Sequence, residues 1–159
     1  MRLLVVAVGH RVPAWIEAGF SEYARRMPRE ARLELVCVKP EPRGSDSERP
    51  AGTKRILDAE AKRIVAALPP GCFTVVLDQR GRSFTTETLA LHLAEWQGRG
   101  DVAFVIGGAD GVAETLLRGA DFRWSLSELT LPHALVRVIL AEQLYRAVSI
   151  RKGLPYHRA

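Results

Sequence analysis

A glycine-rich segment directly after an apolar run is the first place in this chain where ligand chemistry could occur. The apolar run 102–106 is followed by Gly107, Gly108 and Gly111. When a strand ends in glycines, the backbone can approach a ligand closely and present its N–H groups. The dinucleotide motif G-x-G-x-x-G is not met, because Ala109 stands where the second glycine would fall, and no phosphate-binding G-x-x-x-x-G-K-[ST] occurs. A tight turn without a ligand would use the same glycines.

A second loop precedes a long apolar segment and mixes apolar with polar residues. It consists of Ser127, Glu128, Leu129, Thr130, Leu131 and Pro132. Its two leucines could form the walls of a pocket and its hydroxyl groups could provide polar contacts, an arrangement that suits an adenine ring. Because a residue before proline avoids helical dihedral angles, Leu131 ends the loop and Pro132 can open the next helix. A buried connector that only fills the core fits the segment equally well.

The C-terminal tail combines three side chains with different chemistry. Tyr156 offers a ring for stacking, His157 a titratable group, and Arg158 a guanidinium for phosphate. Upstream, Glu142 and Arg146 are four residues apart, so they can pair on one face of a helix. After Glu142 the chain has four basic residues and no acidic one. This cationic segment favours an anionic partner such as nucleic acid, although a solvated, frayed terminus is the alternative.

Other kinds of site find no support in the sequence. The four histidines lack the spacing of metal ligands, and neither C-x-x-C nor H-E-x-x-H occurs, so we expect no metal ion. There is no G-x-S-x-G motif, and Cys37 and Cys72 sit in or beside apolar runs, as buried thiols in a reducing compartment do. Without a signal peptide or an apolar stretch of about 20 residues, we expect a cytoplasmic protein with no membrane partner.

Composition and periodicity predict one soluble α/β domain over residues 1–159. The chain is 47% hydrophobic and 26% charged with a net charge of +5, which is ordinary for a globular protein of this size. Short apolar runs predict strands at residues 3–8, 32–38, 73–77, 102–106 and 123–127. Apolar residues at helical spacing predict helices at about 13–27, 53–68, 85–96 and 132–150, with a short helix opening at 111–112. Since strands and helices alternate, we expect a mostly parallel sheet with helices on both faces.

Two segments depart from this regular pattern. Residues 39–52 are rich in proline, glycine, serine and charge, which predicts a mobile loop. The last helix is apolar around nearly its whole circumference and must therefore be buried on two sides. In so small a domain another subunit most readily provides the second cover, so we expect a homodimer with this helix at the interface. The alternative is a helix enclosed within one chain.

Six segments of the sequence, taken together, resemble one known family. They are Leu4–Gly9, Val105–Gly111, Leu129–His133, Arg137–Val138, Glu142–Ala147 and Tyr156–Arg158. In order and spacing they resemble the ribosomal large-subunit pseudouridine N3-methyltransferase family, the small single-domain branch of the SPOUT (trefoil-knotted) methyltransferases. The resemblance covers essentially the full chain, and residues 39–52 carry little of it.

This resemblance implies a fold, a reaction and a set of site residues. It implies a homodimer with a C-terminal trefoil knot that binds S-adenosyl-L-methionine and methylates N3 of a pseudouridine in 23S (large-subunit) rRNA, as free RNA or in the ribosome. Carried over by position, the cofactor-binding residues would be Leu77, Gly107, Gly108, Ser127, Glu128, Leu129, Thr130, Leu131 and Pro132. The catalytic, substrate-side residues would be Arg146, Tyr156, His157 and Arg158.

The implied reaction assigns roles to the tail. The methyl group of a sulfonium is already activated, so the protein mainly has to align it with the attacking nitrogen and exclude water. The N3 proton must leave, and His157, or a water that it positions, is the candidate base. Arg158 or Arg146 could stabilise the charge that develops on the flanking carbonyl groups. Two other functions remain open: a non-catalytic RNA-binding or ribosome-associated module, and a small-molecule α/β enzyme that uses a nucleotide.

Overall fold

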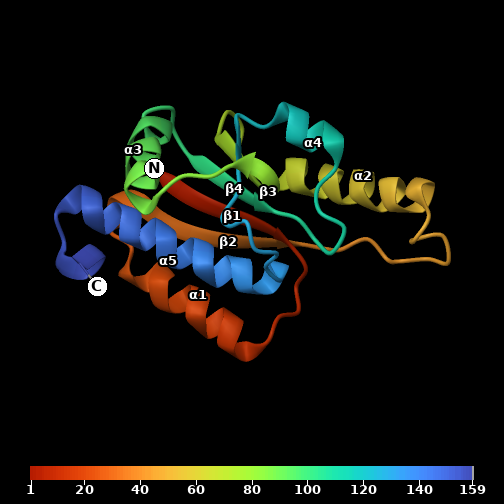
Figure 1. Cartoon of the computed structure of the whole chain (residues 1–159), viewed down its shortest axis with the longest axis horizontal. Coiled ribbons are helices and arrows are strands. Elements are labelled where there is room, and N and C mark those ends of the chain that lie inside the picture. Colours follow the sequence, from red (N-terminus) through yellow and green to blue (C-terminus); the bar gives the residue numbers. More distant parts are fainter. Residues whose placement is uncertain (159) are drawn as a thin grey trace.

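Five parallel strands form one sheet at the centre of the structure, a computed structural model that describes residues 1–158 (Figure 1). The strands are β1 (Arg2–Val8), β2 (Arg32–Val38), β3 (Phe73–Arg82), β4 (Val102–Ile106) and β5 (Phe122–Trp124), and their order in the sheet is β2-β1-β4-β3-β5. All neighbouring strands pair in parallel. The predicted parallel α/β architecture is therefore confirmed.

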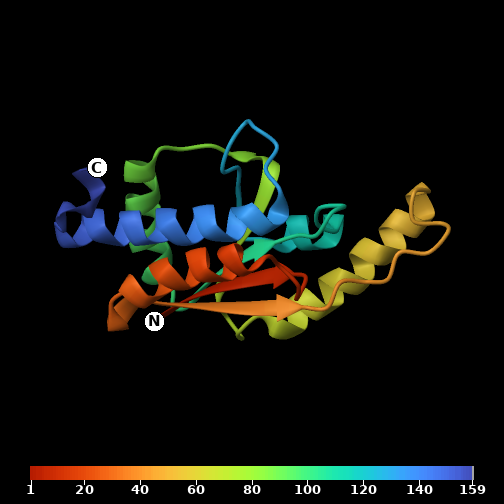
Figure 2. The ribbon, with the colours of Figure 1, turned by 90° about the horizontal axis from the view of Figure 1, so that it is seen from below.

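Helices cover both faces of this sheet (Figures 1 and 2). They are α1 (Ala14–Arg26), α2 (Pro50–Ala67), α3 (Thr86–Gln97), α4 (Glu114–Gly119) and α5 (His133–Lys152), with short 3-10 helices at Arg29–Ala31 and Pro155–Arg158. Successive residues of β1 face opposite sides: Val5 packs in the core with α1, α3 and α5, and Val6 in the core with α2 and α4. Both side chains are completely buried, which explains why β1 is apolar from Leu3 to Val8.

The end of β3 differs from the prediction. The sequence predicted a strand that ends at Leu77, but β3 continues to Arg82, which pairs with Trp124 after an irregular stretch. The backbone N–H of Ser125 also donates to the Arg82 carbonyl at 3.0 Å. β5 in turn ends at Trp124 rather than at residue 127. The segment between Trp124 and α5 is consequently a loop.

Two helices begin at other residues than predicted, and a third begins as expected. α2 begins at Pro50 rather than Thr53, because proline is well tolerated in a first helical turn, so the preceding loop spans residues 39–49. α4 begins at Glu114, after the predicted junction at 111–112. The hydroxyl of Thr85 caps α3 by accepting from the N–H of Thr88 at 3.2 Å.

The long apolar helix α5 is partly enclosed by its own chain. It lies beside α1, where Gly19 leaves room for Val138: a Cβ on Gly19 would come within 3.1 Å of that side chain. On the α3 side, the hydroxyl of Thr86 donates to Gln143 at 2.8 Å. The middle of α5 is buried, whereas apolar residues near its start, including Leu135 and Val138, remain half-exposed. Neither α5 nor another helix within residues 1–158 is long and apolar enough to cross a membrane.

A buried arginine fastens α5 to the sheet. The side chain of Arg137 is almost completely buried and donates to the carbonyl groups of Val8 at 3.2 Å and Gly9 at 2.8 Å. It also donates to the Cys37 sulfur at 3.4 Å. These acceptors lie where β1 and β2 end, so the guanidinium joins α5 to the carboxyl ends of two strands. A charge at such depth is tolerated because its two terminal nitrogens have these three acceptors.

We expect Arg137→Met to lower the free energy of unfolding by about 2–4 kcal/mol, because the carbonyl groups of Val8 and Gly9 would lose a charged donor. Urea denaturation followed by circular dichroism measures this change. Arg118→Met on the exposed side of α4 is the matched control and should change the value by less than about 0.5 kcal/mol. Equal stability of the two variants would show that the Arg137 hydrogen bonds do not hold α5 in place.

Candidate functional site

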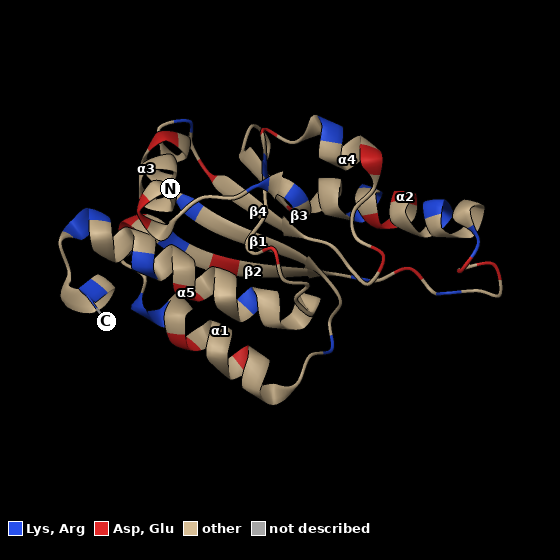
Figure 3. Ribbon diagram, viewed as in Figure 1, with Lys and Arg blue, Asp and Glu red and all other residues tan. Residues whose placement is uncertain are grey.

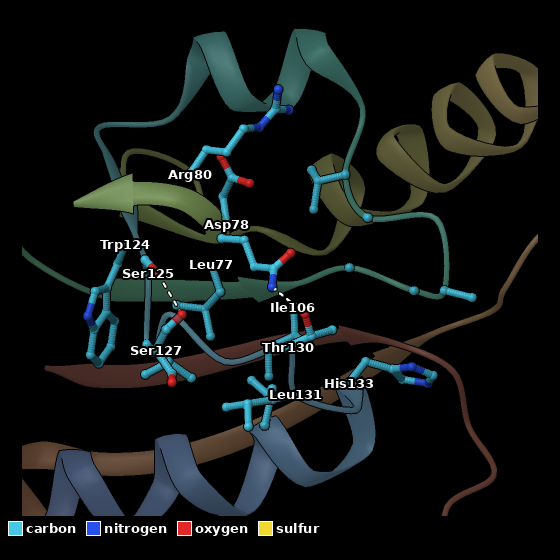
Figure 4. A pocket seen from close by; sticks show the side chains of 18 of the residues that line it. Leu77, Asp78, Arg80, Ile106, Trp124, Ser125, Ser127, Thr130, Leu131 and His133 are labelled. Carbon is cyan, nitrogen blue, oxygen red and sulfur yellow. Dashed lines mark hydrogen bonds between the residues drawn. The ribbon is translucent and has the colours of Figure 1, made fainter. Parts of the chain in front are cut away.

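A cavity of about 500 Å³ opens where the carboxyl ends of three strands meet (Figure 4). Three chain segments form most of its wall: residues 77–80 in the second half of β3, residues 106–112 from the end of β4, and residues 124–131 from the end of β5, except Glu128. His133 and Val136 at the start of α5 close one side. Ligands of open parallel sheets bind at this edge, because the loops that leave the strands converge there.

The glycine loop (residues 107–111) folds back on itself tightly. A Cβ on Gly107 would lie only 2.3 Å from the carbonyl oxygen of Gly111, so no larger residue fits there without a shift of the backbone. The N–H of Gly111 donates to the Gly108 carbonyl at 3.1 Å, and Gly111 has a φ of 88°, which favours glycine. These glycines therefore form a tight turn, and the backbone of that turn borders the cavity. The tight turn and the ligand-binding loop, which the sequence left as alternatives, are thus compatible.

The third wall is built by hydrogen bonds within and between loops. The Ser127 hydroxyl accepts from the N–H of Leu129 at 2.9 Å. The side-chain amide of Gln79 donates to the Thr130 hydroxyl at 2.8 Å, and this bond joins the end of β3 to the loop after β5 (Figure 4). Leu129 is 72% exposed and lies at the rim, whereas Leu131 is half-buried. The loop is thus a shaped wall with polar cross-links rather than a connector that only fills the core.

The cavity combines apolar surfaces with charges of both signs. Apolar side chains on its wall include Leu77, Ile106 and the buried ring of Trp124. Two carboxylates also line it. Asp78 pairs with Arg123 at 2.6 Å, and Asp110 pairs with Arg43 at 2.7 Å. Such a site suits a flat, partly charged molecule of nucleoside size.

The residues expected to bind a cofactor are largely brought together here. Leu77, Gly107, Gly108, Ser127, Leu129, Thr130 and Leu131 line the cavity. Pro132 caps the start of α5 and Glu128 is exposed, and neither lies on the wall.

Sequence reasoning missed several wall residues: Asp78, Gln79, Arg80, Asp110, Trp124 and His133. Their positions in the sequence could have indicated some of them, because Asp78–Arg80 directly follow Leu77 and Asp110 lies within the glycine loop.

The substrate-side residues form a second cluster farther along α5. The Glu142 carboxylate accepts from the Tyr156 hydroxyl at 3.1 Å and from Arg146 at 2.8 Å. The Arg146 guanidinium lies 4.8 Å from the centre of the Tyr156 ring, and Tyr145 packs against the same ring. The tail is therefore docked on α5 in the structure, as one turn of 3-10 helix that also contains His157 and Arg158.

Within one chain this cluster lies away from the cavity. His133 and Val136 mark the cavity end of α5, and Glu142 and Arg146 lie roughly 9–20 Å farther along the helix axis. Figures 1 and 2 show the C-terminus at the opposite end of α5 from the loop that precedes it.

Burial and hydrogen bonding shift the pKa of three groups around these clusters. Burial raises the pKa of the Glu60 carboxyl, which lies beside Gly108 and accepts from the N–H of Glu41 at 3.1 Å. The hydrogen bond to Glu142 raises the pKa of Arg146, which keeps this guanidinium charged. Burial, followed by hydrogen bonds to Tyr23 and Glu142, raises the pKa of Tyr156, so its hydroxyl stays protonated. Within residues 1–158 no group of three metal-ligating side chains lies close enough together to hold a metal ion.

Comparison with known proteins identifies the class of this fold and site. The family model described as "Predicted SPOUT methyltransferase" matches residues 1–157, so the chain belongs to the SPOUT methyltransferase family. Members of this family use S-adenosylmethionine as methyl donor. A solved structure described as a probable methylase family protein from Haemophilus influenzae has a similar fold, with a TM-score of 0.53 and 17% identity over 97% of this chain and 68% of that one.

Closer relatives are proteins named ribosomal RNA large subunit methyltransferase H. The protein of that name from Nitrosospira multiformis is 54% identical over 160 residues, covering 100% of both chains. The one from Ralstonia pickettii is 57% identical over 159 residues, covering 99% of both.

The cavity fits the methyl donor of this family in size and chemistry. Its volume is within the range of small-molecule sites, and its apolar wall can enclose an adenine ring. The lining carboxylate of Asp78 suits a ligand that carries a sulfonium and an ammonium group, and Arg80 can meet a ligand carboxylate.

The raised pKa of Glu60 predicts a specific pH dependence of stability. A carboxyl whose pKa is higher in the folded state contributes stability below its unfolded pKa, near 4.5, and loses it as the pH rises through the folded value. We therefore expect Glu60→Gln to become more stable relative to wild type as the pH rises from about 4 to about 7. Urea denaturation at a series of pH values measures this difference. The exposed Glu48→Gln is the control, and a parallel trend in both variants would contradict a burial effect at Glu60.

Proposed function

We propose that this protein transfers the methyl group of S-adenosylmethionine to N3 of a pseudouridine in 23S rRNA. Membership of the SPOUT family and full-length relatives named for methylation of large-subunit rRNA support this function. The observation that carries it is the convergence of three loops, at one edge of the sheet, on a cavity that suits the donor. The protein would act in the cytoplasm on large-subunit rRNA or the ribosome.

The three loops would divide the binding of the donor between them. The backbone of Gly107 and Gly108 would border the ligand where no Cβ obstructs it. Leu77, Leu129 and Leu131 would hold the adenine ring, and Ser127 and Thr130 keep their loop in shape through the hydrogen bonds described above. Glu128 and Pro132 would contribute to donor binding from positions beside the wall of the cavity. When bound, the donor supplies a methyl group that its sulfonium has already activated.

The tail would provide the residues that handle the RNA. His157 would accept the N3 proton, directly or through a water molecule. The guanidinium groups of Arg146 and Arg158 would bind phosphate or stabilise the charge that develops on the base. Tyr156 would stack and, through its bond to Glu142, keep the tail docked on α5. Figure 3 shows basic residues gathered at this end of α5 and on the tail, as an anionic partner requires.

We also infer that the tail of one subunit completes the cavity of its partner. Within one chain the tail cluster lies along α5 away from the cavity, so a second copy offers the shorter way to unite them. The half-exposed Leu135 and Val138, and Trp15 with 61% of its surface exposed on α1, form an apolar area that such a partner would cover. The C-terminal trefoil knot typical of the family belongs to this proposal as well.

Methyl transfer from a labelled donor tests the function. We expect the protein to label ribosomal fractions, with the label on N3 of one pseudouridine of 23S rRNA as mapped by mass spectrometry. His157→Ala should slow single-turnover transfer and change the pH dependence of its rate, because the candidate base is removed. An unchanged pH profile and rate would remove His157 from the chemistry. RNA binding without donor binding in calorimetry would identify a non-catalytic RNA-binding module instead.

Mixing two inactive variants tests the exchange of tails. Gly107→Ala should block the donor site, and Arg158→Ala should disable the tail. In randomly mixed dimers, half would be heterodimers with one intact cavity facing one intact tail, so activity should recover to about a quarter of the wild-type value. The rate of methyl transfer measures this recovery. Activity no higher than the mean of the two separate variants would place the tail in the cavity of its own chain.

A further inference from the structure

The glycine loop contains only one long side chain by which the rest of the protein can hold it. Residues 107–111 are three glycines, Ala109 and Asp110. Glycine loses more conformational freedom on folding than any other residue, so ordering a loop of this composition has a large cost in conformational entropy. Its inner side rests on Val8 and Glu60, which lie beside Gly108. Its outer side can be fastened through the carboxylate of Asp110.

Arg43 makes that connection from a distant part of the chain. Its two terminal nitrogens donate to the two carboxylate oxygens of Asp110 at 2.7 and 3.2 Å, a bidentate pair across 67 residues. Asp110 is the more buried partner, with 19% of its side chain exposed against 48% for Arg43. Bidentate guanidinium–carboxylate pairs fix orientation as well as distance. The glycine loop is thus fastened on one side by packing and on the other by Arg43.

The loop that carries Arg43 (residues 39–49) is itself anchored on α2. The carboxylate of Glu60 accepts from the N–H of Glu41, and Arg63 donates to the carbonyl group of Lys39 at 3.0 Å and pairs with Glu41. Nearer α2, a Cβ on Gly52 would lie 2.0 Å from the Asp46 carbonyl oxygen, so glycine permits the loop to lie directly against the helix. Figure 3 shows acidic and basic residues mixed along α2 and this loop. Because this loop is anchored, Arg43 has a fixed position from which it can hold Asp110.

We propose that Arg43 is a positioning residue for the methyl-donor site: through Asp110 it holds the glycine loop in its binding conformation before the donor arrives. This inference rests on the proposed function, because it assigns the donor to the cavity beside that loop. Ordering a flexible loop in advance strengthens binding without any new contact to the ligand. Replacing Arg43 should therefore lower the affinity for the donor and leave the rate of methyl transfer at saturating donor unchanged.

Calorimetric titration with S-adenosylmethionine tests this proposal. Arg43→Ala should weaken donor binding about fivefold, and Asp110→Asn about as much, because each breaks the same partly exposed ion pair. In the Asp110→Asn background, Arg43→Ala should have less than about a twofold further effect. The matched control is Arg55→Ala, which removes contacts of the same loop to Glu41 and Asp46 but leaves Asp110 paired, and it should bind as wild type does.

Hydrogen exchange of the ligand-free protein provides a second measurement. Amides of residues 107–112 should exchange faster in Arg43→Ala and at the wild-type rate in Arg55→Ala. Independent effects of the two substitutions in the double variant, an equal loss in the Arg55 control, or unchanged exchange would each overturn the proposal. If wild type itself fails to bind the donor, the proposed function falls as well. If wild type binds and Arg43→Ala binds equally, only the role of Arg43 is refuted.

Discussion

The attachment of α5 to the sheet by Arg137 is the interaction on which both parts of the site depend. The guanidinium meets carbonyl groups at the carboxyl end of β1, next to the edge where the cavity opens. α5 has 20 residues, and a helix of that length is stiff, so fixing it near its start also fixes the loop before it and the tail docked behind it. A buried charge would be unfavourable without these acceptors, which explains why the strand ends and the helix are arranged around it.

The two clusters of site residues meet different physical demands. Around the cavity, the protein must order glycine-rich backbone, and it does so with cross-links between loops, such as the bond from Gln79 to Thr130. At the tail, it must keep a cationic and aromatic surface available, and the Glu142 carboxylate there holds Arg146 and Tyr156 in one geometry. Rigid placement suits a small donor, whereas an exposed basic surface suits a large anionic substrate.

The sequence predicted the features that depend on local patterns. β2 and β4 were predicted to the residue, because β4 is buried and apolar throughout and the apolar residues of β2 form a short run that ends before Lys39. The predicted end of β3 at Leu77 was wrong, since residues 78–82 are not apolar and only Arg82 among them pairs with β5, at Trp124. The pair of Arg43 and Asp110 joins two loops that no local pattern connects. The predicted mobility of the loop before α2 stays a prediction.

The separation of cavity and tail within one chain has a consequence for catalysis. The attacking nitrogen is acidic only to a modest degree, so the reaction needs a base and a cation close to it as well as an aligned methyl group. A single chain can build the cavity from its own three loops, but its tail is docked on α5 beside Tyr145. If the tail serves a partner, an isolated subunit would bind the donor without the groups that deprotonate and hold the base. Assembly would then be a condition for chemistry rather than only for stability.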